Sequence, residues 1–329
     1  MGKNKINITF SIVRVFAIIS IACAHINIPQ PVWVAKMMST FGSVGVTIFI
    51  ILSGYFYHSD KYKNILQMLS SKVKSIFIPW AVFGSLFYLW GAIVGGNGIN
   101  PVLWITYILG YKTFFYYLSV LVLCYLIFFK RNKIVMYFMM CLNVISVYLT
   151  AMGLLDGIIQ SLHITNYLNI FNWAGYFAIG YLLQEVKGEQ IIDLLRRTMF
   201  FSTTISLVLY ILICTFNIQN GYFSFIGMPY QLVTAMALMG ISTYNIFDKS
   251  IVHKMSNLTF GVYLIHMFVV SIGIKLCGFS IPTKLSTPIV VVAICMLVLE
   301  IGHFISKKIH LEKLYCTLTG VRLDRNFKK

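Results

Sequence analysis

Charged residues, and acidic residues above all, are scarce in this chain of 329 residues. Asp, Glu, Lys and Arg together make up 11% of the chain, and only 9 residues are acidic against 26 basic ones. At the same time 59% of the residues are hydrophobic, and the mean hydropathy is +0.83. Soluble globular domains carry about 25% charged residues. The scarcity of charge therefore excludes a soluble domain of this length and predicts a membrane protein.

Paired cysteines and strand-like alternation are also missing. The seven cysteines have no C-x-x-C spacing and lie mostly inside apolar runs, so they support neither a disulfide framework nor a metal site. The apolar runs extend over about 20 residues without the period of two that a membrane β-barrel requires. The sequence therefore predicts an all-α protein that crosses the membrane several times.

Apolar segments follow one another along nearly the whole sequence, and we count ten of them as membrane spans. They define a transmembrane domain over residues 1–310, followed by a basic cytoplasmic tail over residues 311–329. We place the ten segments near residues 8–27, 41–58, 75–95, 113–130, 134–151, 167–184, 199–216, 225–247, 257–276 and 286–306.

The basic residues fall mostly on one side of these spans. The other side holds only four of them, and the positive-inside rule therefore places both termini in the cytoplasm. The net charge of +17 is mainly this topology signal and does not indicate nucleic acid. It also favours attraction of anionic lipid or of an anionic cytosolic cosubstrate. The four basic residues of the outer side are Lys36, Lys112, Lys275 and Lys284.

The first span carries an arginine and a histidine, which are unusual in an apolar helix. Arg14 and His25 are eleven residues apart, which places them within roughly 20° of one helix face and about 16 Å apart along the axis. The predicted topology puts Arg14 in the inner half of the membrane and His25 near the outer end. The basic start and the Ala22-Cys23-Ala24 run also resemble a cleaved signal peptide, but Arg14 in the middle of the apolar run argues against cleavage.

Candidate donor-binding residues lie on the cytoplasmic side. The second span contains small residues that permit close packing against the first, and it brings Ser53 and Tyr55 to about the depth of Arg14. Lys72 and Lys74 follow at the membrane edge, where they could hold a polyphosphate, although a solvated loop that sets the topology is the commoner reading of such a cluster.

Candidate acceptor-binding residues lie towards the outer side. We expect Trp104, Trp173 and His266 to contact the acceptor, although interface anchoring is the commoner role of Trp104 and a buried structural role is equally expected for His266. The outer loop over residues 152–166 adds side chains that suit a hydroxyl-rich ligand, namely Asp156, Gln160, His163, Thr165 and Asn166.

The first span suits acyl transfer. A neutral histidine accepts a proton from an attacking alcohol, and a cation orients the donor or stabilises an oxyanion. A donor that enters beside Arg14 needs a long, thin arm to reach His25, and the pantetheine arm of coenzyme A has this shape. We therefore expect a thioester of coenzyme A as a cosubstrate, an acceptor that approaches His25 from the outer side, contact with the lipid bilayer, and no metal.

Four stretches resemble the acyltransferase-3 family of integral membrane O-acyltransferases. The resemblance extends over nearly the whole chain in the number and order of spans. The matching stretches are Arg14 with His25 as R-x10-H, residues 42–55 as a GxxGVxxFFxxSGY-like span, the basic residues 72–74 before Ile78-Pro79, and residues 258–266 as an SxxxYxIYLxH-like span.

The resemblance implies a bacterial inner-membrane enzyme with a carbohydrate acceptor, which transfers an acetyl group from acetyl-CoA to hydroxyls of a cell-envelope polysaccharide or its lipid-linked precursor. It further implies that His25 is the general base and that Arg14 orients the donor or stabilises charge. Two departures stand out: residues 114–118 read Phe-Phe-Tyr-Tyr-Leu where many members have His-x-Trp-Phe, and lysines replace the arginines common after the second span. An exporter of a glycan intermediate and a sensor without turnover are the alternatives.

Overall fold

The computed structural model describes residues 2–25, 32–95, 98–219, 221–244, 246–276 and 281–322. Every regular element within these ranges is helical, so the all-α prediction is confirmed. The helices are α1 Gly2–His25, α2 Val32–Gly42, α3 Val44–Phe56, η1 Ser59–Lys61, α4 Ile65–Lys72, η2 Val73–Phe77, α5 Ile78–Gly95, α6 Pro101–Ile108, α7 Tyr116–Ile127, α8 Lys133–Ala151, α9 Asp156–Ser161, η3 Ile170–Asn172, α10 Ala174–Leu183, α11 Gly188–Thr215, α12 Gly227–Ser242, α13 Lys249–Leu276, α14 Ile281–Lys308 and α15 Glu312–Thr319.

Seven helical stretches of the described chain are long and apolar enough to cross a membrane, which confirms a multi-pass membrane protein. The remaining three predicted spans correspond to the shorter helices α7, α10 and α12. The count of ten spans and the cytoplasmic placement of both termini stay predictions. The seven stretches are Ile6–His25, Val32–Phe56, Ile65–Val94, Lys133–Ala151, Gly188–Thr215, Lys249–Ile272 and Leu285–Lys308.

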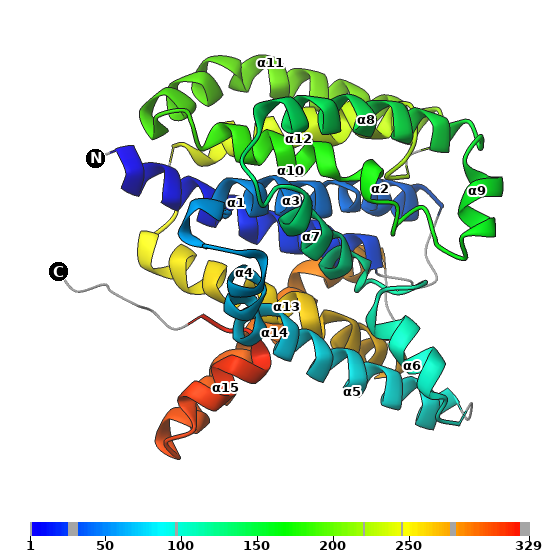
Figure 1. The fold of residues 1–329 in the computed structure, drawn as a ribbon, viewed down its shortest axis with the longest axis vertical. Coiled ribbons are helices and arrows are strands. Elements are labelled where there is room, and N and C mark those ends of the chain that lie inside the picture. The colour runs from blue at the N-terminus through cyan, green and yellow to red at the C-terminus, as the bar shows by residue number, and fades with distance from the viewer. Residues whose placement is uncertain are drawn as a thin grey trace.

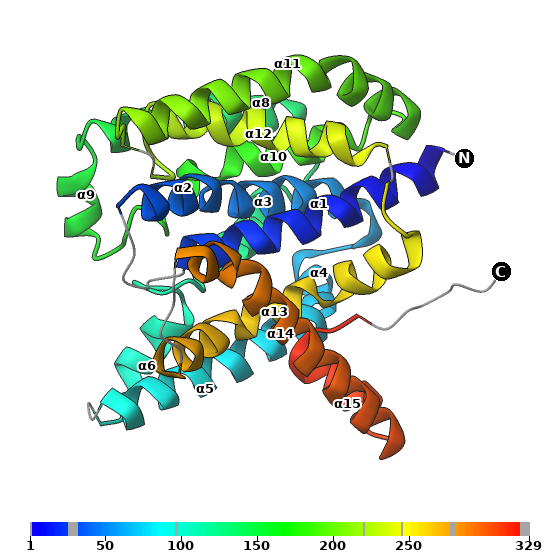
Figure 2. The same cartoon turned by 180° about the vertical axis from the view of Figure 1, so that it is seen from behind.

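Helix α1 lies at the centre of the bundle. It packs against α2 and α3, against α13 and α14, and against α11 and α12. Figures 1 and 2 show it between a layer that contains α8, α10, α11 and α12 and a second layer that contains α5, α13 and α14. A helix in this position is surrounded by protein on most sides, which is how a polar residue can be kept inside a membrane domain.

Small residues bring α1 and its sequence neighbours close together. A β-carbon added to Gly45 would lie 2.4 Å from the carbonyl oxygen of Ala17, and one added to Gly42 would lie 2.6 Å from the backbone nitrogen of Ala24. Such approaches exclude any side chain. The predicted packing of the first two apolar segments is therefore confirmed.

Helices α3 and α10 cross at an even shorter distance. A β-carbon on Gly180 would lie 1.8 Å from the carbonyl oxygen of Ile51, and one on Gly54 would lie 2.1 Å from the carbonyl oxygen of Phe177. Because both obstacles are backbone atoms, no side-chain rotation can relieve them. The crossing thus determines the position of the α3 turn that carries Ser53.

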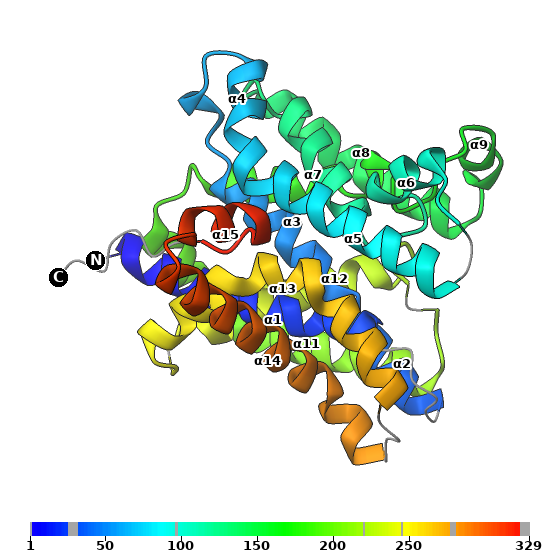
Figure 3. The ribbon, with the colours of Figure 1, turned by 90° about the horizontal axis from the view of Figure 1, so that it is seen from below.

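The two ends of the bundle carry different elements. Figure 3 shows the start of α1, α4 and α15 at one end, and α2, α6 and α9 at the other. Under the predicted topology the first is the inner end and the second the outer end. Helix α1 runs from one to the other, so Arg14 and His25 belong to different ends.

Replacement of Gly180 by alanine tests the crossing of α3 and α10. Because the added methyl group meets backbone, we expect the free energy of unfolding to fall by about 1–3 kcal/mol, as for overpacked cores. Gly91→Ala is the matched control, since a β-carbon there meets no atom within 4 Å and alanine favours a helix by about 1 kcal/mol over glycine. Thermal unfolding of the purified proteins in detergent measures both, and equal stability of the two variants would contradict the crossing.

Candidate active site

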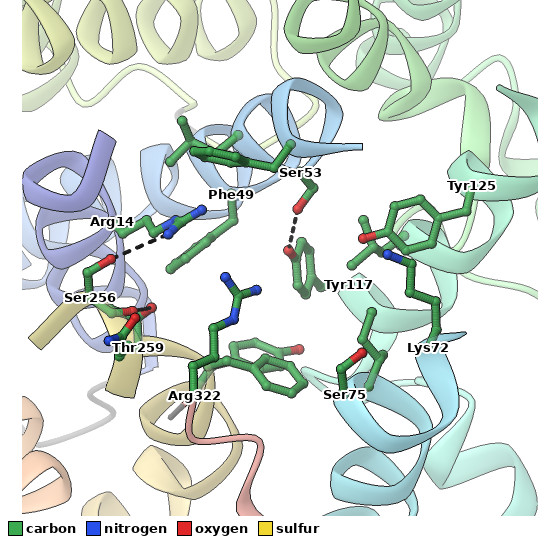
Figure 4. A pocket seen from close by; sticks show the side chains of 17 residues that line it. Arg14, Phe49, Ser53, Lys72, Ser75, Tyr117, Tyr125, Ser256, Thr259 and Arg322 are labelled. Carbon is green, nitrogen blue, oxygen red and sulfur yellow. Dashed lines mark hydrogen bonds between the residues drawn. The ribbon is translucent and has the colours of Figure 1, made fainter. Parts of the chain in front are cut away.

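A cavity of about 170 Å³ opens beside Arg14 towards the inner end. Its wall combines residues from α1, α3, α4, η2, α7, α13 and the segment after α15. Ser53 and Lys72, two of the predicted donor-side residues, line it together with Arg14 (Figure 4). The structure therefore brings three separate parts of the sequence to one cavity, which we call the inner cavity.

Arg14 is held by neutral groups. Its Nη1 donates to the hydroxyl oxygen of Ser256 over 3.4 Å, and its guanidinium carbon lies 4.4 Å from the ring centre of Phe56. A guanidinium has five N–H donors in a planar fork. Among the described residues no acidic side chain lines this cavity, so the charge of Arg14 is not neutralised from the cavity wall.

Tyr55 and Lys74 are not among the residues that line the inner cavity. The Tyr55 ring instead packs edge-on against Phe10 at 4.7 Å, and Lys74 is exposed. The reason is helical geometry, because residues two positions apart point about 200° away from each other. When Ser53 and Lys72 face the cavity, their neighbours at i+2 must face elsewhere. The donor-binding role of these two residues stays a prediction, and neither of them lines the inner cavity.

A second and larger cavity, of about 770 Å³, lies at the outer end and includes His25. We call it the outer cavity. Aromatic residues form much of its wall, and polar side chains from α9 and from the loops before α7 and after α9 complete it. Four residues that the sequence marked as suited to a hydroxyl-rich ligand line it, namely Asp156, Gln160, Thr165 and Asn166, whereas His163 is not among the lining residues.

Neither predicted tryptophan lines the outer cavity. Trp173 is fully buried, and its Nε1 donates to the carbonyl oxygen of Tyr167 over 2.9 Å. Its ring packs against Tyr116 and Tyr222, which do line the cavity. Trp104 lies on α6, and its Nε1 donates to Ser85. Trp173 thus supports the cavity wall from behind, and an acceptor contact of either tryptophan stays a prediction.

His266 lies directly behind His25. The ring centres of the two histidines are 5.2 Å apart, and His266 is fully buried. The Nδ1 atom of His266 is 2.7 Å from the carbonyl oxygen of Tyr263. A carbonyl oxygen only accepts, so the proton of a neutral His266 is on Nδ1 and Nε2 presents a lone pair. Among the described residues this buried Nε2 has no hydrogen-bond partner.

An aromatic layer separates the two cavities, formed by Phe114, Tyr117 and Tyr263. Tyr117 and Tyr263 line the inner cavity, Phe114 lines the outer one, and no described residue lines both. The Tyr263 hydroxyl donates to the carbonyl oxygen of Phe114, and Tyr117 is 3.2 Å from the Ser53 hydroxyl. The run at residues 114–118 that departs from the family pattern therefore contributes two members of this layer.

Several lining residues were not predicted from the sequence. Ser256, Thr259, Phe260 and Tyr263 follow a spacing of three and four residues along α13 and continue to His266, so a helical-face argument from that histidine could have found them. Tyr117 and Arg322 offer no comparable signal. They reach the cavity only because α7 and the segment after α15 fold back onto α3 and α13.

Comparison with known proteins identifies one family. A model of an acyltransferase domain, that of the acyltransferase-3 family, matches residues 7–302, which is nearly the whole chain. No curated protein and no solved structure matches the sequence.

The side of the membrane that each cavity faces can be tested with single-cysteine variants. Ser75 lines the inner cavity and Gln160 lines the outer one. We expect a membrane-impermeant maleimide to label Gln160→Cys in intact cells, and to label Ser75→Cys only in inverted vesicles. The unsubstituted chain measures the background from native cysteines such as Cys141. The opposite pattern would show that the predicted topology is reversed.

Proposed function

Because the chain belongs to the acyltransferase-3 family and is a membrane acyltransferase, we propose that it moves an acetyl group from cytosolic acetyl-CoA to a hydroxyl of an envelope glycan. The acceptor is a cell-envelope polysaccharide or its lipid-linked precursor, and the protein resides in a bacterial inner membrane. The donor enters the inner cavity and the acceptor enters the outer cavity. Only the acyl group then has to cross the membrane.

One observation carries this proposal: a single helix presents Arg14 to one cavity and His25 to another at the opposite end. The axial distance of about 16 Å between these two residues calls for a donor whose reactive group is at the end of a long arm. The thioester of coenzyme A lies at the end of its pantetheine arm. The polar side chains among the aromatic wall of the outer cavity suit a carbohydrate, whose hydroxyls need both donors and acceptors.

His25 acts as the general base in this proposal. It accepts the proton of the acceptor hydroxyl while that oxygen bonds to the thioester carbonyl carbon. The C–S bond then breaks, and the protonated His25 returns the proton to the leaving thiolate. The products are an O-acetyl ester and free coenzyme A.

His266 acts as a positioning residue for His25. The buried Nε2 of His266 has a lone pair, and the ring centres of the two histidines are 5.2 Å apart, so a rotation of the rings can bring an N–H of His25 to this lone pair. A hydrogen bond of this kind selects one tautomer of His25 and leaves the other ring nitrogen free to act as a base. The direct acceptor contact that the sequence predicted for His266 stays a prediction.

Arg14 orients the donor. The axial separation of about 16 Å along α1 is too large for its guanidinium to stabilise an oxyanion at His25, so the donor-orienting role is the better of the two considered. The aromatic layer lies across the route of the pantetheine arm. The proposed reaction therefore requires that Phe114, Tyr117 or Tyr263 change rotamer when the donor binds.

Replacement of His25 by alanine tests the proposed function. We expect O-acetylation of the surface polysaccharide to fall by about 10²- to 10⁴-fold, the usual contribution of a general base, while the polysaccharide still reaches the surface. Mass spectrometry of the polysaccharide measures the acyl mass and the amount together. His163→Asn is the control, because it removes an exposed outer histidine at a φ of 51° that asparagine tolerates. Loss of the polysaccharide itself in the His25 variant would favour an exporter instead.

Two replacements of His266 separate positioning from packing. Phenylalanine keeps a planar ring but has no acceptor, whereas the amide oxygen of glutamine can take the place of Nε2. We expect His266→Phe to lower kcat by about tenfold or more with little change in the KM for acetyl-CoA, and His266→Gln to restore most of it. Release of coenzyme A by isolated membranes supplied with the polysaccharide measures both constants. Equal losses in the two variants would indicate a packing role only.

A further inference from the structure

We propose that Arg322 is a donor-binding residue, which together with Arg14 binds a phosphate or diphosphate group in the inner cavity. Arg322 lies beyond the residues that the family model matches and follows the last helix of the chain. The inference deepens the proposed function and rests on it for the identity of the donor.

The position of Arg322 is built by specific contacts of the segment before it. Helix α15 is attached to α14 by the Tyr315 hydroxyl, which donates to the carbonyl oxygen of Leu299 over 2.8 Å, and by His303 and Glu312, whose side chains are 2.9 Å apart. Gly320 then ends the helix with a φ of +68°. These contacts direct the chain away from α15 and back towards α13.

The backbone after Gly320 is attached to α13. A β-carbon at Gly320 would lie 2.4 Å from the Phe260 ring, so the chain passes directly over this cavity residue. The backbone nitrogen of Arg322 donates to the carbonyl oxygen of Asn257 over 3.4 Å. Figure 4 shows the side chain of Arg322 extending from this point into the cavity, where it faces Arg14 and Tyr117.

The inner cavity carries positive charge that its described lining residues do not balance. Arg14, Lys72 and Arg322 line it, and no acidic residue is found among the lining residues that the structure describes. Arg14 and Lys72 meet aromatic rings, at 4.4 Å and 4.9 Å from the ring centres of Phe56 and Tyr125. Like charges that face one cavity repel each other, and a bound anion converts this repulsion into attraction.

The geometry of the donors favours phosphate. Two guanidinium groups each offer a planar fork that matches phosphate oxygens in pairs, and Lys72 adds a point charge. The hydroxyls of Ser53 and Ser75 also line the cavity and can donate to further oxygens. Coenzyme A carries a diphosphate and a 3′-phosphate, so the shared chemistry of the site and of the proposed donor is the phosphate group. Anionic lipid headgroups offer the same group.

The proposed role of Arg322 can be tested by ligand binding alone, without an acyl acceptor. The full chain is purified in detergent, and isothermal titration calorimetry measures the affinity for inorganic pyrophosphate and for coenzyme A. We expect Arg322→Ala to weaken both affinities at least tenfold and Arg322→Lys to weaken them less. Lys313→Ala is the matched control, because Lys313 is an exposed basic residue of α15 outside the cavity lining. Unchanged affinities in the folded Arg322→Ala protein would overturn the proposal.

Further experiments distinguish a failure of this inference from a failure of the proposed function. His25→Ala should bind coenzyme A as the unsubstituted chain does, although its acyl transfer falls by about 10²- to 10⁴-fold. If Arg322→Ala loses pyrophosphate binding but the polysaccharide carries no acyl group in any strain, the anion site stands and the proposed function fails. Nanodiscs with phosphatidylglycerol instead of phosphatidylcholine test the lipid source. Competition of phosphatidylglycerol with pyrophosphate through Arg322 would assign the site to a lipid headgroup and overturn its role in donor binding.

Discussion

A guanidinium in the apolar part of a membrane costs about 2.5–3.5 kcal/mol or more unless protein, water or an anion surrounds it. Arg14 on α1 imposes this constraint, and much of the described structure is arranged around it. Helix α1 is placed at the centre of the bundle, Ser256 and Phe56 contact the guanidinium, and a cavity opens beside it. The absence of an acidic side chain from the described lining leaves that cavity suited to an anionic ligand.

Close backbone packing fixes the positions of the residues around Arg14. The crossing of α3 and α10 at Gly54 and Gly180 leaves no space for a side chain, so the turn that carries Ser53 cannot shift away from α1. A site that is built on rigid helices in this way holds its functional groups more accurately than one built on loops. The outer cavity is different, because its polar groups come from the short helix α9 and from the loops before α7 and after α9. Loops vary more among related proteins than the helices they connect, so under the proposed function this end is where acceptor specificity can vary without disturbing the inner cavity.

The aromatic layer separates the two cavities. Phe114 lies just before α7, Tyr117 lies at the start of α7 and Tyr263 lies on α13. Hydrogen bonds to Ser53 and to the Phe114 carbonyl hold the two tyrosines in place. In the proposed reaction such a barrier would keep water, the competing nucleophile in acyl transfer, away from the path between donor and acceptor. The departure of residues 114–118 from the family pattern thus falls within the layer that lies between the two cavities.

Composition and helical periodicity alone determined the all-α membrane architecture, the packing of the first two segments, and the placement of Arg14 and His25 on one helix face. They also placed Arg14, Ser53 and Lys72 in one predicted donor site, because the depth of a residue in the membrane can be counted along each helix. Helical geometry places the two members of each pair, Lys72 with Lys74 and Ser53 with Tyr55, on different faces. Only the tertiary structure decided which member faces the cavity, since the rotation of a helix about its axis depends on its neighbours. It also placed His266 beside His25 and brought Arg322 to Arg14. These contacts join residues more than 200 positions apart, and no local pattern in the sequence encodes them.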